Sequence, residues 1–461
     1  MPSLEQIANR FGLNTSVDLE ITGTALSSGH VRPGYLFIAA PGKKSHGLDH
    51  LEQAITNGAV AVLSDRPSSL PTLVHPDPRA IAGELSAMVF GTPATGLVAI
   101  TGTNGKTSVS TYLYRFLVAL GEKTGLICGT GSVVAGEPVS NQLTTPEAPR
   151  IHQLLSDMRA KGENRVVIEV SAQAIERGRI GGLIFDLAGF TNLSRDHLDD
   201  FGSMESYFAT KARLFEKDLS AKAVINVEDE FGRRLLKDSA IPTIGIGAGL
   251  DYELSSLQPL ALSGKHQLQL NVDLGSTMAK NLALAAVMAI ELGHDPGDVA
   301  SVANELDLRV PGRLERVSER GPAVYVDYAH TPAGVKAAVS DSLARHSELT
   351  VVLGASGNRD TGKRKEMALA TSGAKLVIVT DQHPRDEDPA TIRNMLLEAL
   401  SDAGIDHLDI PDPCEAIARA ISLAGSAAVL WCGPGHLDYR EITGQKVPFK
   451  ALEIARELVE R

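Results

Sequence analysis

Short apolar stretches alternate with longer amphipathic ones along the chain, beginning in the first ninety or so residues. Apolar segments at Tyr35–Ala39 and Ala59–Leu63 predict strands, and the patterns over 48–57 and 80–89 predict helices. This region ends in the Gly-, Pro- and Thr-rich stretch 91–96, which is typical of a linker. An N-terminal α/β unit is therefore expected.

A second region repeats the alternation on a larger scale. It opens with the apolar strand Leu97–Ile100, the segment TGTNGKT and a helical run over 108–120. The alternation of polar and apolar residues over 252–273 predicts β-hairpins, and a helix from Ala279 to Leu292 is expected to end at Gly293. Further strands are predicted at 165–170, 183–190 and 223–226.

The last region again alternates strands with helices. Strands are predicted at 323–327, 350–353, 376–380 and 428–432, and helices include 391–403 and 413–424. Such alternation favours parallel sheets covered by helices on both faces, whose active residues follow the carboxyl ends of strands. We therefore predict an α/β chain of three domains, comprising residues 1–92, 93–308 and 309–461.

Composition agrees with this division and excludes several classes. A length of 461 residues corresponds to about three domains. The net charge of −12 makes the chain a poor general binder of nucleic acid or anionic membrane. Three distant cysteines argue against a disulfide framework or a zinc cluster, and the N-terminus does not resemble a signal peptide. A soluble, cytoplasmic protein is expected, with neither nucleic acid nor membrane as a partner.

The segment TGTNGKT has the composition of a phosphate-binding loop between a strand and a helix. Its glycines let backbone N–H groups surround phosphate oxygens, Lys106 supplies a positive charge, and the Thr107 hydroxyl is a magnesium ligand. Ile100 stands where the first glycine of the longer motif belongs, so the loop is a shortened variant. The alternative is a glycine-rich turn without a ligand. The expected phosphate-binding residues are Gly102, Thr103, Asn104, Gly105, Lys106 and Thr107.

Eight further motifs accompany the loop. They are TTPEAP (144–149), IEVSAQAIERGRI (168–180), FTNLSRDHLD (190–199), KARLF (211–215), VPGRLERV (310–317), VDYAHTP (326–332), GNRDTGKR (357–364) and HPRDEDP (383–389). In this order they resemble the Mur ligase family, the ATP-dependent amide-bond ligases of peptidoglycan precursor synthesis. The similarity is greatest to the MurE-type branch, which adds the third amino acid to UDP-MurNAc-L-Ala-D-Glu. It implies a UDP-binding domain, a central ATPase domain and a C-terminal Rossmann-like domain.

The resemblance implies a mechanism through an acyl phosphate, with ATP and Mg²⁺ as cofactors. Lys106, His197 and Lys211 are the implied catalytic residues, and Thr107, Glu169, His197 and Lys211 the implied metal-site residues. Glu169 could instead be an exposed strand-end carboxylate, and His197 a structural histidine. Lys211 matches a carbamylated lysine of the family, whereas its residue type alone indicates a surface lysine on a helix.

Other implied residues contact the nucleotide and the UDP-linked substrate. Asn281 matches an adenine contact, and Arg313 and Asp327 match ATP contacts from the third domain; the latter two could instead form a domain-interface ion pair. The implied binding residues for the UDP-sugar peptide are Ser28, Thr144, Thr145, Ser171, Arg177 and Arg179.

The amino-acid pocket departs most from the family pattern. Arg385 and Arg359 are expected to hold carboxylates of the substrate, with His383 and Gly433 beside them. Leu437 replaces a glutamate that would meet an ammonium group. Two interpretations stay open: a diamino acid such as meso-diaminopimelate or L-lysine in a rearranged pocket, or a less cationic third residue.

Two other functions are compatible with parts of the pattern. A folylpolyglutamate synthetase shares the central machinery but normally lacks the first domain and the TTPEAP and AQAIERGRI segments. A non-catalytic nucleotide-binding paralogue would explain the altered amino-acid motif and the altered uridine motif, in which Ser27 and Gly29 replace the Asp and Arg that flank the family's serine. Such a paralogue would be expected to lose some of the implied catalytic residues. The expected partners are UDP-MurNAc-dipeptide and a free amino acid, and the expected state is a monomer.

Overall fold

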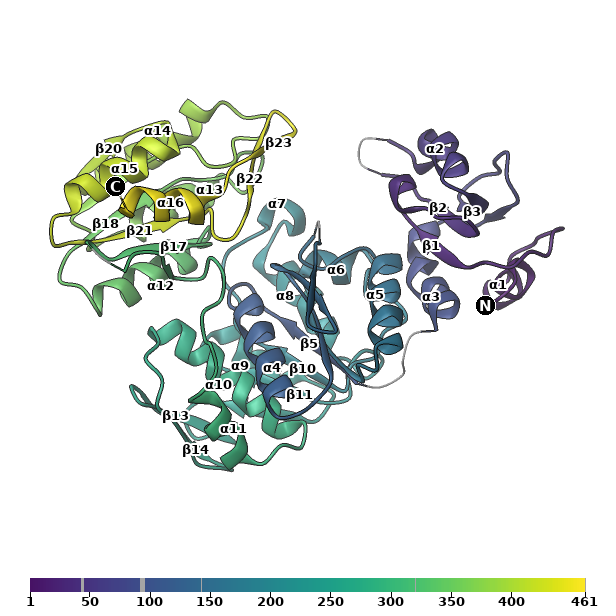
Figure 1. Cartoon of the computed structure of the whole chain (residues 1–461), viewed down its shortest axis with the longest axis horizontal. Coiled ribbons are helices and arrows are strands. Elements are labelled where there is room, and N and C mark those ends of the chain that lie inside the picture. The colour runs from purple at the N-terminus through teal and green to yellow at the C-terminus, as the bar shows by residue number, and fades with distance from the viewer. Residues whose placement is uncertain (43–44, 92–95, 142, 320, 461) are drawn as a thin grey trace.

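The computed structural model describes residues 1–42, 45–91, 96–141, 143–319 and 321–460. Three large sheets follow one another along the chain and form three lobes, coloured from purple through teal to yellow in Figure 1. The central lobe lies between the other two. This is the predicted α/β architecture. The predicted boundary between residues 92 and 93 lies outside the described residues, and the boundary between 308 and 309 stays a prediction.

The first lobe is a four-stranded parallel sheet in the order β1-β2-β3-β4. Its strands are short and almost entirely buried because helices cover them, and the predicted strands over 35–39 and 59–63 are confirmed. The elements are α1 (Leu4–Phe11), β1 (Gly23–Ala25), η1 (Ser28–His30), β2 (Tyr35–Ala39), η2 (Gly47–His50), α2 (Leu51–Thr56), β3 (Ala59–Ser64), β4 (Thr72–Val74) and α3 (Pro78–Phe90).

The central sheet has the order β15-β14-β13-β12-β11-β10-β5-β9-β6-β7-β8, parallel from β13 to β6, and the predicted hairpins extend one edge. β10 begins at Leu187, later than predicted, because the residues before it form only an isolated parallel bridge, between Phe185 and Ser220. The strands are β5 (Leu97–Thr101), β6 (Thr124–Cys128), β7 (Gly131–Val134), β8 (Glu137–Val139), β9 (Arg165–Glu169), β10 (Leu187–Phe190), β11 (Ala223–Asn226), β12 (Thr243–Ile246), β13 (Tyr252–Leu257), β14 (Leu260–Gly264) and β15 (Leu268–Leu270).

Helices cover both faces of this sheet, and each face has its own apolar core. Helix α10 is buried on nearly all sides, which explains the uninterrupted apolar run at its centre. The helices are α4 (Lys106–Ala119), α5 (Ala148–Ala160), α6 (Ala172–Glu176), α7 (Leu198–Phe201), α8 (Met204–Ala212), η3 (Arg213–Phe215), α9 (Glu230–Asp238), α10 (Ser276–Glu291) and α11 (Pro296–Ala303).

The third lobe is a six-stranded sheet in the order β16-β17-β21-β18-β19-β20, parallel except for β16, with a separate hairpin of β22 and β23. Its four predicted strands are confirmed. The elements are β16 (Glu315–Arg316), β17 (Val324–Asp327), α12 (Pro332–Leu343), β18 (Leu349–Leu353), α13 (Gly362–Leu369), β19 (Leu376–Val379), α14 (Pro389–Asp402), β20 (His407–Asp409), α15 (Pro413–Ala424), β21 (Ala428–Cys432), β22 (Tyr439–Ile442), β23 (Gln445–Pro448) and α16 (Ala451–Glu460).

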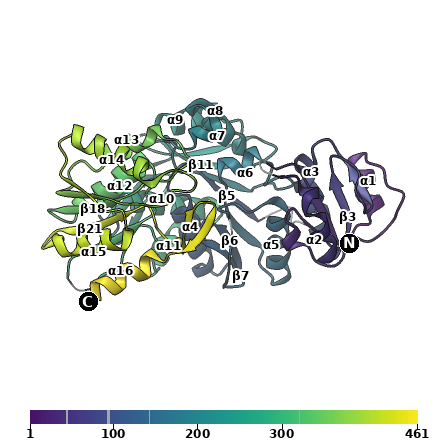
Figure 2. The same ribbon diagram turned by 90° about the horizontal axis from the view of Figure 1, so that it is seen from above.

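The first and central lobes meet through a close backbone contact. Helix α3 packs against α5, as the view from above shows (Figure 2). A Cβ atom on Gly83 would lie 2.5 Å from the carbonyl oxygen of Gly181, so only glycine fits there. Arg159 of α5 also donates to the carbonyl of Phe90 at the end of α3. This joint is closely packed.

The central and third lobes meet through polar side chains. Arg195 forms a two-bonded ion pair with Asp360, at 2.9 and 3.1 Å. Asp341 of α12 accepts hydrogen bonds from the backbone N–H groups of Ser276 (2.9 Å) and Thr277 (3.1 Å), and from the Ser276 hydroxyl. A residue of the third lobe therefore caps the N-terminus of a central helix.

We expect Asp341→Ala to lower the free energy of unfolding of the docked protein by about 1–2 kcal/mol, because it uncaps α10 and removes part of the joint. The thermal midpoint measures this loss, and small-angle scattering measures opening between the lobes. The exposed Asp402, replaced by alanine, is the matched control. Identical melting and scattering curves for both variants would contradict the proposed role of Asp341.

Candidate active site

The phosphate loop joins β5 to α4, and its geometry requires two of its glycines. Gly102 and Gly105 both have positive φ angles, of 145° and 84°. A Cβ atom would lie 1.9 Å from the Thr191 hydroxyl at Gly102, and 2.4 Å from the Asn281 side chain at Gly105. The loop therefore needs glycine at both positions, and Asn281 lies directly beside it.

Residues of a neighbouring strand end hold the loop in place. Thr191 and Asn192 both donate to the backbone carbonyl of Asn104, at 2.6 and 3.0 Å, and the Asn104 N–H donates to the Asn192 side chain. Thr331 of the third lobe donates to the Asn104 side chain at 3.2 Å. The loop is therefore ordered by its surroundings, which reduces the ordering needed when a phosphate binds.

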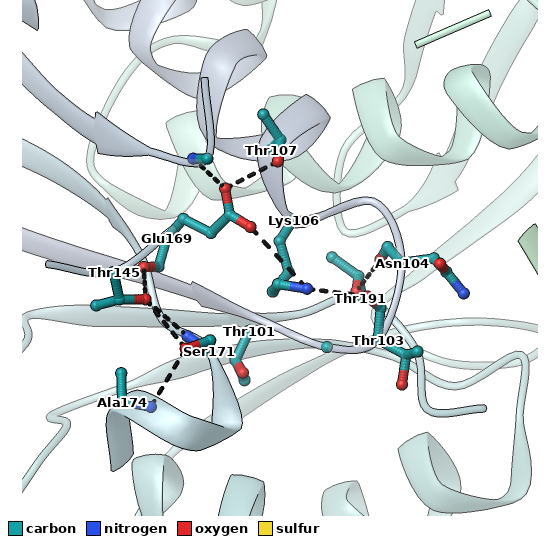
Figure 3. Close-up of polar contacts among 12 residues, drawn as sticks. Thr101, Thr103, Asn104, Lys106, Thr107, Thr145, Glu169, Ser171, Ala174 and Thr191 are labelled. Carbon is teal, nitrogen blue, oxygen red and sulfur yellow. Dashed lines mark hydrogen bonds and ion pairs between the residues drawn. The ribbon is translucent and has the colours of Figure 1, made fainter. Parts of the chain in front are cut away.

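Glu169 connects the loop to the sheet (Figure 3). It lies at the end of β9, 2 % exposed, and accepts hydrogen bonds from the Thr107 hydroxyl (2.9 Å) and the Gly129 N–H (2.8 Å). The Lys106 ammonium lies 3.9 Å from its other oxygen and donates to the Thr103 carbonyl. Burial lowers the pKa of Lys106, and Glu169 opposes part of that shift. The alternative of an exposed Glu169 is wrong.

The oxygen atoms of Thr107 and Glu169 suit a magnesium ion. Mg²⁺ uses one or two protein oxygens and takes its other ligands from water and substrate phosphates. In the described part of the chain, no group of three or more His, Cys, Asp or Glu side chains could hold a metal ion. Thr107 and Glu169 could supply the protein oxygens for an ion that a bound nucleotide also holds.

Lys211 lies beneath the loop and is 1 % exposed, so the interpretation of a surface lysine is wrong. Its Nζ donates to the Gly102 carbonyl at 2.8 Å and lies 4.8 Å from the centre of the Tyr207 ring. The pKa of Lys211 is held well below its usual value, mainly because the side chain is buried and secondly because the positive charge of Lys106 is near. Tyr207 is four residues earlier on α8, and this spacing was the available signal for an inward-facing side chain.

Asp196 brings together side chains from two lobes. It is buried and lies 3.2 Å from Nε2 of His197, 3.6 Å from Nε2 of His330 and 2.9 Å from Nζ of Lys363. Burial raises its pKa, but the hydrogen bond from His330 and the nearby cations outweigh burial and leave the pKa well below normal. Burial lowers the pKa of His197 to about 4, so its imidazole is neutral at pH 7. Lys363 was not predicted, although it lies in the GNRDTGKR segment.

Arg313 and Asp327 face the loop from the third lobe. Arg313 donates to the Thr107 hydroxyl at 3.2 Å, which brings a cation next to the expected phosphate position. Asp327 accepts from the N–H groups of Leu314 (2.5 Å) and Ala329 (2.6 Å), and burial raises its pKa. Asp327 therefore holds two backbone segments of the third lobe together, the one after Arg313 and the one after β17.

A second group of polar residues lies beyond Glu169. The Thr145 hydroxyl donates to the backbone carbonyl of Glu169 at 2.8 Å and accepts from the N–H of Ser171. Arg179 is buried, donates to the Thr145 carbonyl and pairs with Glu147 at 3.1 Å. These contacts fix one wall of the cleft.

The third lobe forms the end of the cleft where the residues expected to meet the amino acid lie. A Cβ atom on Gly433 would lie 2.1 Å from the Gln382 side chain, so the backbone of Gly433 packs directly against Gln382. Burial lowers the pKa of His383 to about 4, which makes it neutral. Arg359 pairs with Asp199 of the central lobe at 3.3 Å.

These groups surround one cleft of about 1190 Å³ between the central and third lobes, and most of them line it. Gly102 and Lys211 lie behind its surface. Ser28 lies in the first lobe, where its hydroxyl donates to Gln53 at 2.7 Å, and it does not appear among the described lining residues. The predicted residues that line the cleft are Thr103, Asn104, Gly105, Lys106, Thr107, Thr144, Thr145, Glu169, Ser171, Arg177, Arg179, His197, Asn281, Arg313, Asp327, Arg359, His383, Arg385, Gly433 and Leu437.

A phosphate loop facing an arginine from a separate Rossmann-like lobe defines a nucleotide-dependent enzyme that assembles its site between domains. Three family profiles match the chain: "Mur ligase family, catalytic domain" over 20–89, "Mur ligase middle domain" over 100–289, and "Mur ligase, glutamate ligase domain" over 312–435. The chain belongs to the Mur ligase family.

Individual relatives match along nearly the whole length. A UDP-N-acetylmuramyl-tripeptide synthetase of Leifsonia xyli is 42% identical, covering 98% of this chain and 95% of the relative. A UDP-N-acetylmuramoyl-L-alanyl-D-glutamate–2,6-diaminopimelate ligase of Streptomyces coelicolor is 36% identical, covering 99% of this chain and 96% of the relative. A solved structure of a ligase with the latter name is 28% identical, with a TM-score of 0.63 and 95% of both chains covered.

Within the described ranges, no helix is both long and apolar enough to cross a bilayer.

Proposed function

We propose that this protein is an ATP-dependent ligase that adds the third amino acid, a diamino acid, to UDP-MurNAc-L-Ala-D-Glu. The observation that carries the proposal is the position of Lys106, Thr107 and Glu169 opposite Arg313 in one cleft. The full-length similarity to a tripeptide synthetase and to diaminopimelate ligases supports the choice of substrates.

The proposed reaction has two steps. The substrate carboxylate attacks the γ-phosphorus of ATP, forming an acyl phosphate and releasing ADP. The amine of the amino acid then attacks the acyl carbon, loses a proton and expels inorganic phosphate. Lys106 and Arg313 neutralise phosphate charge from opposite lobes. Thr107 and Glu169 would hold Mg²⁺, which neutralises phosphate charge when bound.

We propose that Lys211 carries a carbamate. Its pKa is held well below normal because it is buried beside Lys106, which favours the uncharged amine, the form that attacks CO₂. The product would be an anion beneath the phosphate loop, where the ammonium contacts the Gly102 carbonyl in the unmodified side chain. Intact-protein mass spectrometry in bicarbonate at neutral pH tests this assignment.

Residues beyond Glu169 are proposed to hold the UDP-linked substrate. Arg177 faces the cleft, and Arg179 fixes the wall through Glu147 and Thr145. Ser28 would contact the uridine from the first lobe.

A panel assay tests the proposed function. We expect phosphate release from ATP only when both UDP-MurNAc-L-Ala-D-Glu and an amino acid are present. The carboxylate of the UDP-dipeptide is needed to form the acyl phosphate, and the amine of the amino acid is needed to release phosphate from it. The panel contains meso-diaminopimelate, lysine, ornithine, diaminobutyrate, homoserine, alanine and glutamate. A reaction mixture that lacks only the UDP-dipeptide serves as the control. Nucleotide binding without phosphate release for any amino acid would indicate the non-catalytic paralogue instead.

A further inference from the structure

The amino-acid end of the cleft is closed by a part of the third lobe that we call the hairpin wall. It consists of residues 382–385 and the β22–β23 hairpin, residues 439–448. In Figure 1 the hairpin lies on the side of the third lobe toward α7, and several of its residues line the cleft. The wall is absent from the predicted elements, because its strands are short and almost entirely polar or exposed.

Arg385 has a constrained position in this wall. Its φ angle is 55°, a left-handed conformation that is uncommon for a residue with a side chain. Hydrogen bonds to the hairpin hold it: its N–H donates to the Glu441 carbonyl at 3.0 Å, and its carbonyl accepts from Thr443 at 2.7 Å. Strained backbone of this kind is retained where it places a functional side chain.

Glu441 is joined to the same loop three times. Besides its carbonyl contact, its N–H donates to Nδ1 of His383 at 3.0 Å, and its carboxylate Oε2 accepts from Nε of Arg385 at 3.0 Å. The Glu441 side chain is 37 % exposed and lines the cleft. Its backbone contacts therefore hold the carboxylate beside the guanidinium, at the surface that an amino acid would meet.

This pairing changes which substrate charges the wall can accept. Arg385 already has a carboxylate partner, and its Nη1 also donates to the Gly357 carbonyl at 3.4 Å. A second carboxylate on the amino acid would have to compete with Glu441 for it. The other carboxylate oxygen of Glu441, Oε1, has no hydrogen-bond partner within the described ranges and can accept from an ammonium group.

Four side chains near Glu441 also leave this end of the cleft able to accept a positively charged group. His383 is neutral, and Leu437 has no charge to offer. Lys446 is opposite Glu441 in the hairpin register, but its ammonium lies 4.3 Å from the centre of the Tyr439 ring. Asp438 also lines the cleft and is exposed, which adds negative charge at the same end.

We propose that Glu441 is the specificity-determining residue for the side chain of the added amino acid. Its carboxylate binds the side-chain ammonium, and its pairing with Arg385 disfavours a second carboxylate. The pocket then selects a diamino monocarboxylic acid over a diamino dicarboxylic acid. This inference rests on the proposed function and narrows its substrate class.

The test compares L-lysine, L-ornithine and meso-diaminopimelate as acceptors for the full-length enzyme with ATP, Mg²⁺ and UDP-MurNAc-L-Ala-D-Glu. The wild type is expected to have a higher kcat/KM for lysine or ornithine than for meso-diaminopimelate. In Glu441→Gln, the KM for the preferred acceptor should rise about tenfold or more, and the preference should shift toward meso-diaminopimelate. The KM values for ATP and the UDP-dipeptide should stay unchanged.

Two further variants keep the test decisive. Glu441→Asp retains the charge on a shorter side chain and should restore most of the wild-type preference even if Glu441→Gln is poorly folded. Glu453→Gln, at an exposed glutamate of α16 paired with Lys450, is the matched control and should behave as the wild type.

The outcomes separate this inference from the function on which it rests. An active Glu441→Gln enzyme whose acceptor preference is within twofold of the wild type overturns the role of Glu441. A wild-type enzyme that prefers meso-diaminopimelate overturns it as well. Failure of every amino acid to support phosphate release overturns the proposed function, and this inference with it.

Discussion

Lys106→Ala is expected to lower kcat by roughly 100- to 1,000-fold while the fold is retained. The Lys106 ammonium is held between Glu169 and the Thr103 carbonyl, at the surface of the cleft where the nucleotide phosphates are proposed to lie. Alanine removes a positive charge that is more useful to the transition state, in which charge on the transferred phosphoryl group is redistributed, than to the ground state. Phosphate release measured at saturating substrates reports the effect.

The exposed Lys217, replaced by alanine, is the control, because it removes the same charge away from the cleft. Circular dichroism and the thermal midpoint verify that both variants are folded. Turnover of the Lys106 variant within a few-fold of the Lys217 variant would contradict the phosphate-binding role of the loop.

Glu169→Gln is expected to have the second large effect, with a kcat reduced roughly 100-fold and a raised Mg²⁺ requirement. Glutamine keeps the size of the side chain and can still accept from the Thr107 hydroxyl or the Gly129 N–H. It lacks the negative charge that would attract the metal ion and that stabilises the buried Lys106 ammonium. A Mg²⁺ titration of the reaction rate separates the metal effect from a simple loss of turnover.

Glu398→Gln on the exposed surface of α14 is the matched control for this change. If Glu169→Gln shows the same Mg²⁺ dependence and rate as the Glu398 variant, then Glu169 has no part in metal binding. A reduced rate with an unchanged Mg²⁺ dependence would limit its role to ordering Lys106 and Thr107.

The parts of the site that could be predicted from the sequence are those encoded locally. The phosphate loop combines glycines, a lysine and a threonine within seven residues, so its shape and chemistry follow from one short segment. Glu169 ends an apolar strand, and its position at the carboxyl end of the central sheet, beside the phosphate loop, follows from the parallel pairing of β5 and β9.

Contacts between distant segments could not be predicted in this way. Lys363 and Asp196 are 167 positions apart, and neither residue type nor spacing indicates that they pair. Arg385 and Glu441 are 56 positions apart and meet only because a short polar hairpin returns to the loop. The spacing of Tyr207 and Lys211 on α8 indicates a shared face, but the position of that face beneath the phosphate loop depends on contacts between distant segments.

The two joints between lobes differ in kind, and this difference predicts how each responds to solvent. The contact of Gly83 with Gly181 brings main chains together, so its strength depends on steric fit and little on ionic strength. The contacts made by Asp341 and by Arg195 with Asp360 are charged or polar and lie at a cleft or near the surface, where dissolved salt weakens them. The first joint also contains an ion pair, between Arg79 and Glu147, but its main-chain contact does not depend on salt. Salt should therefore loosen the third lobe more than the first lobe.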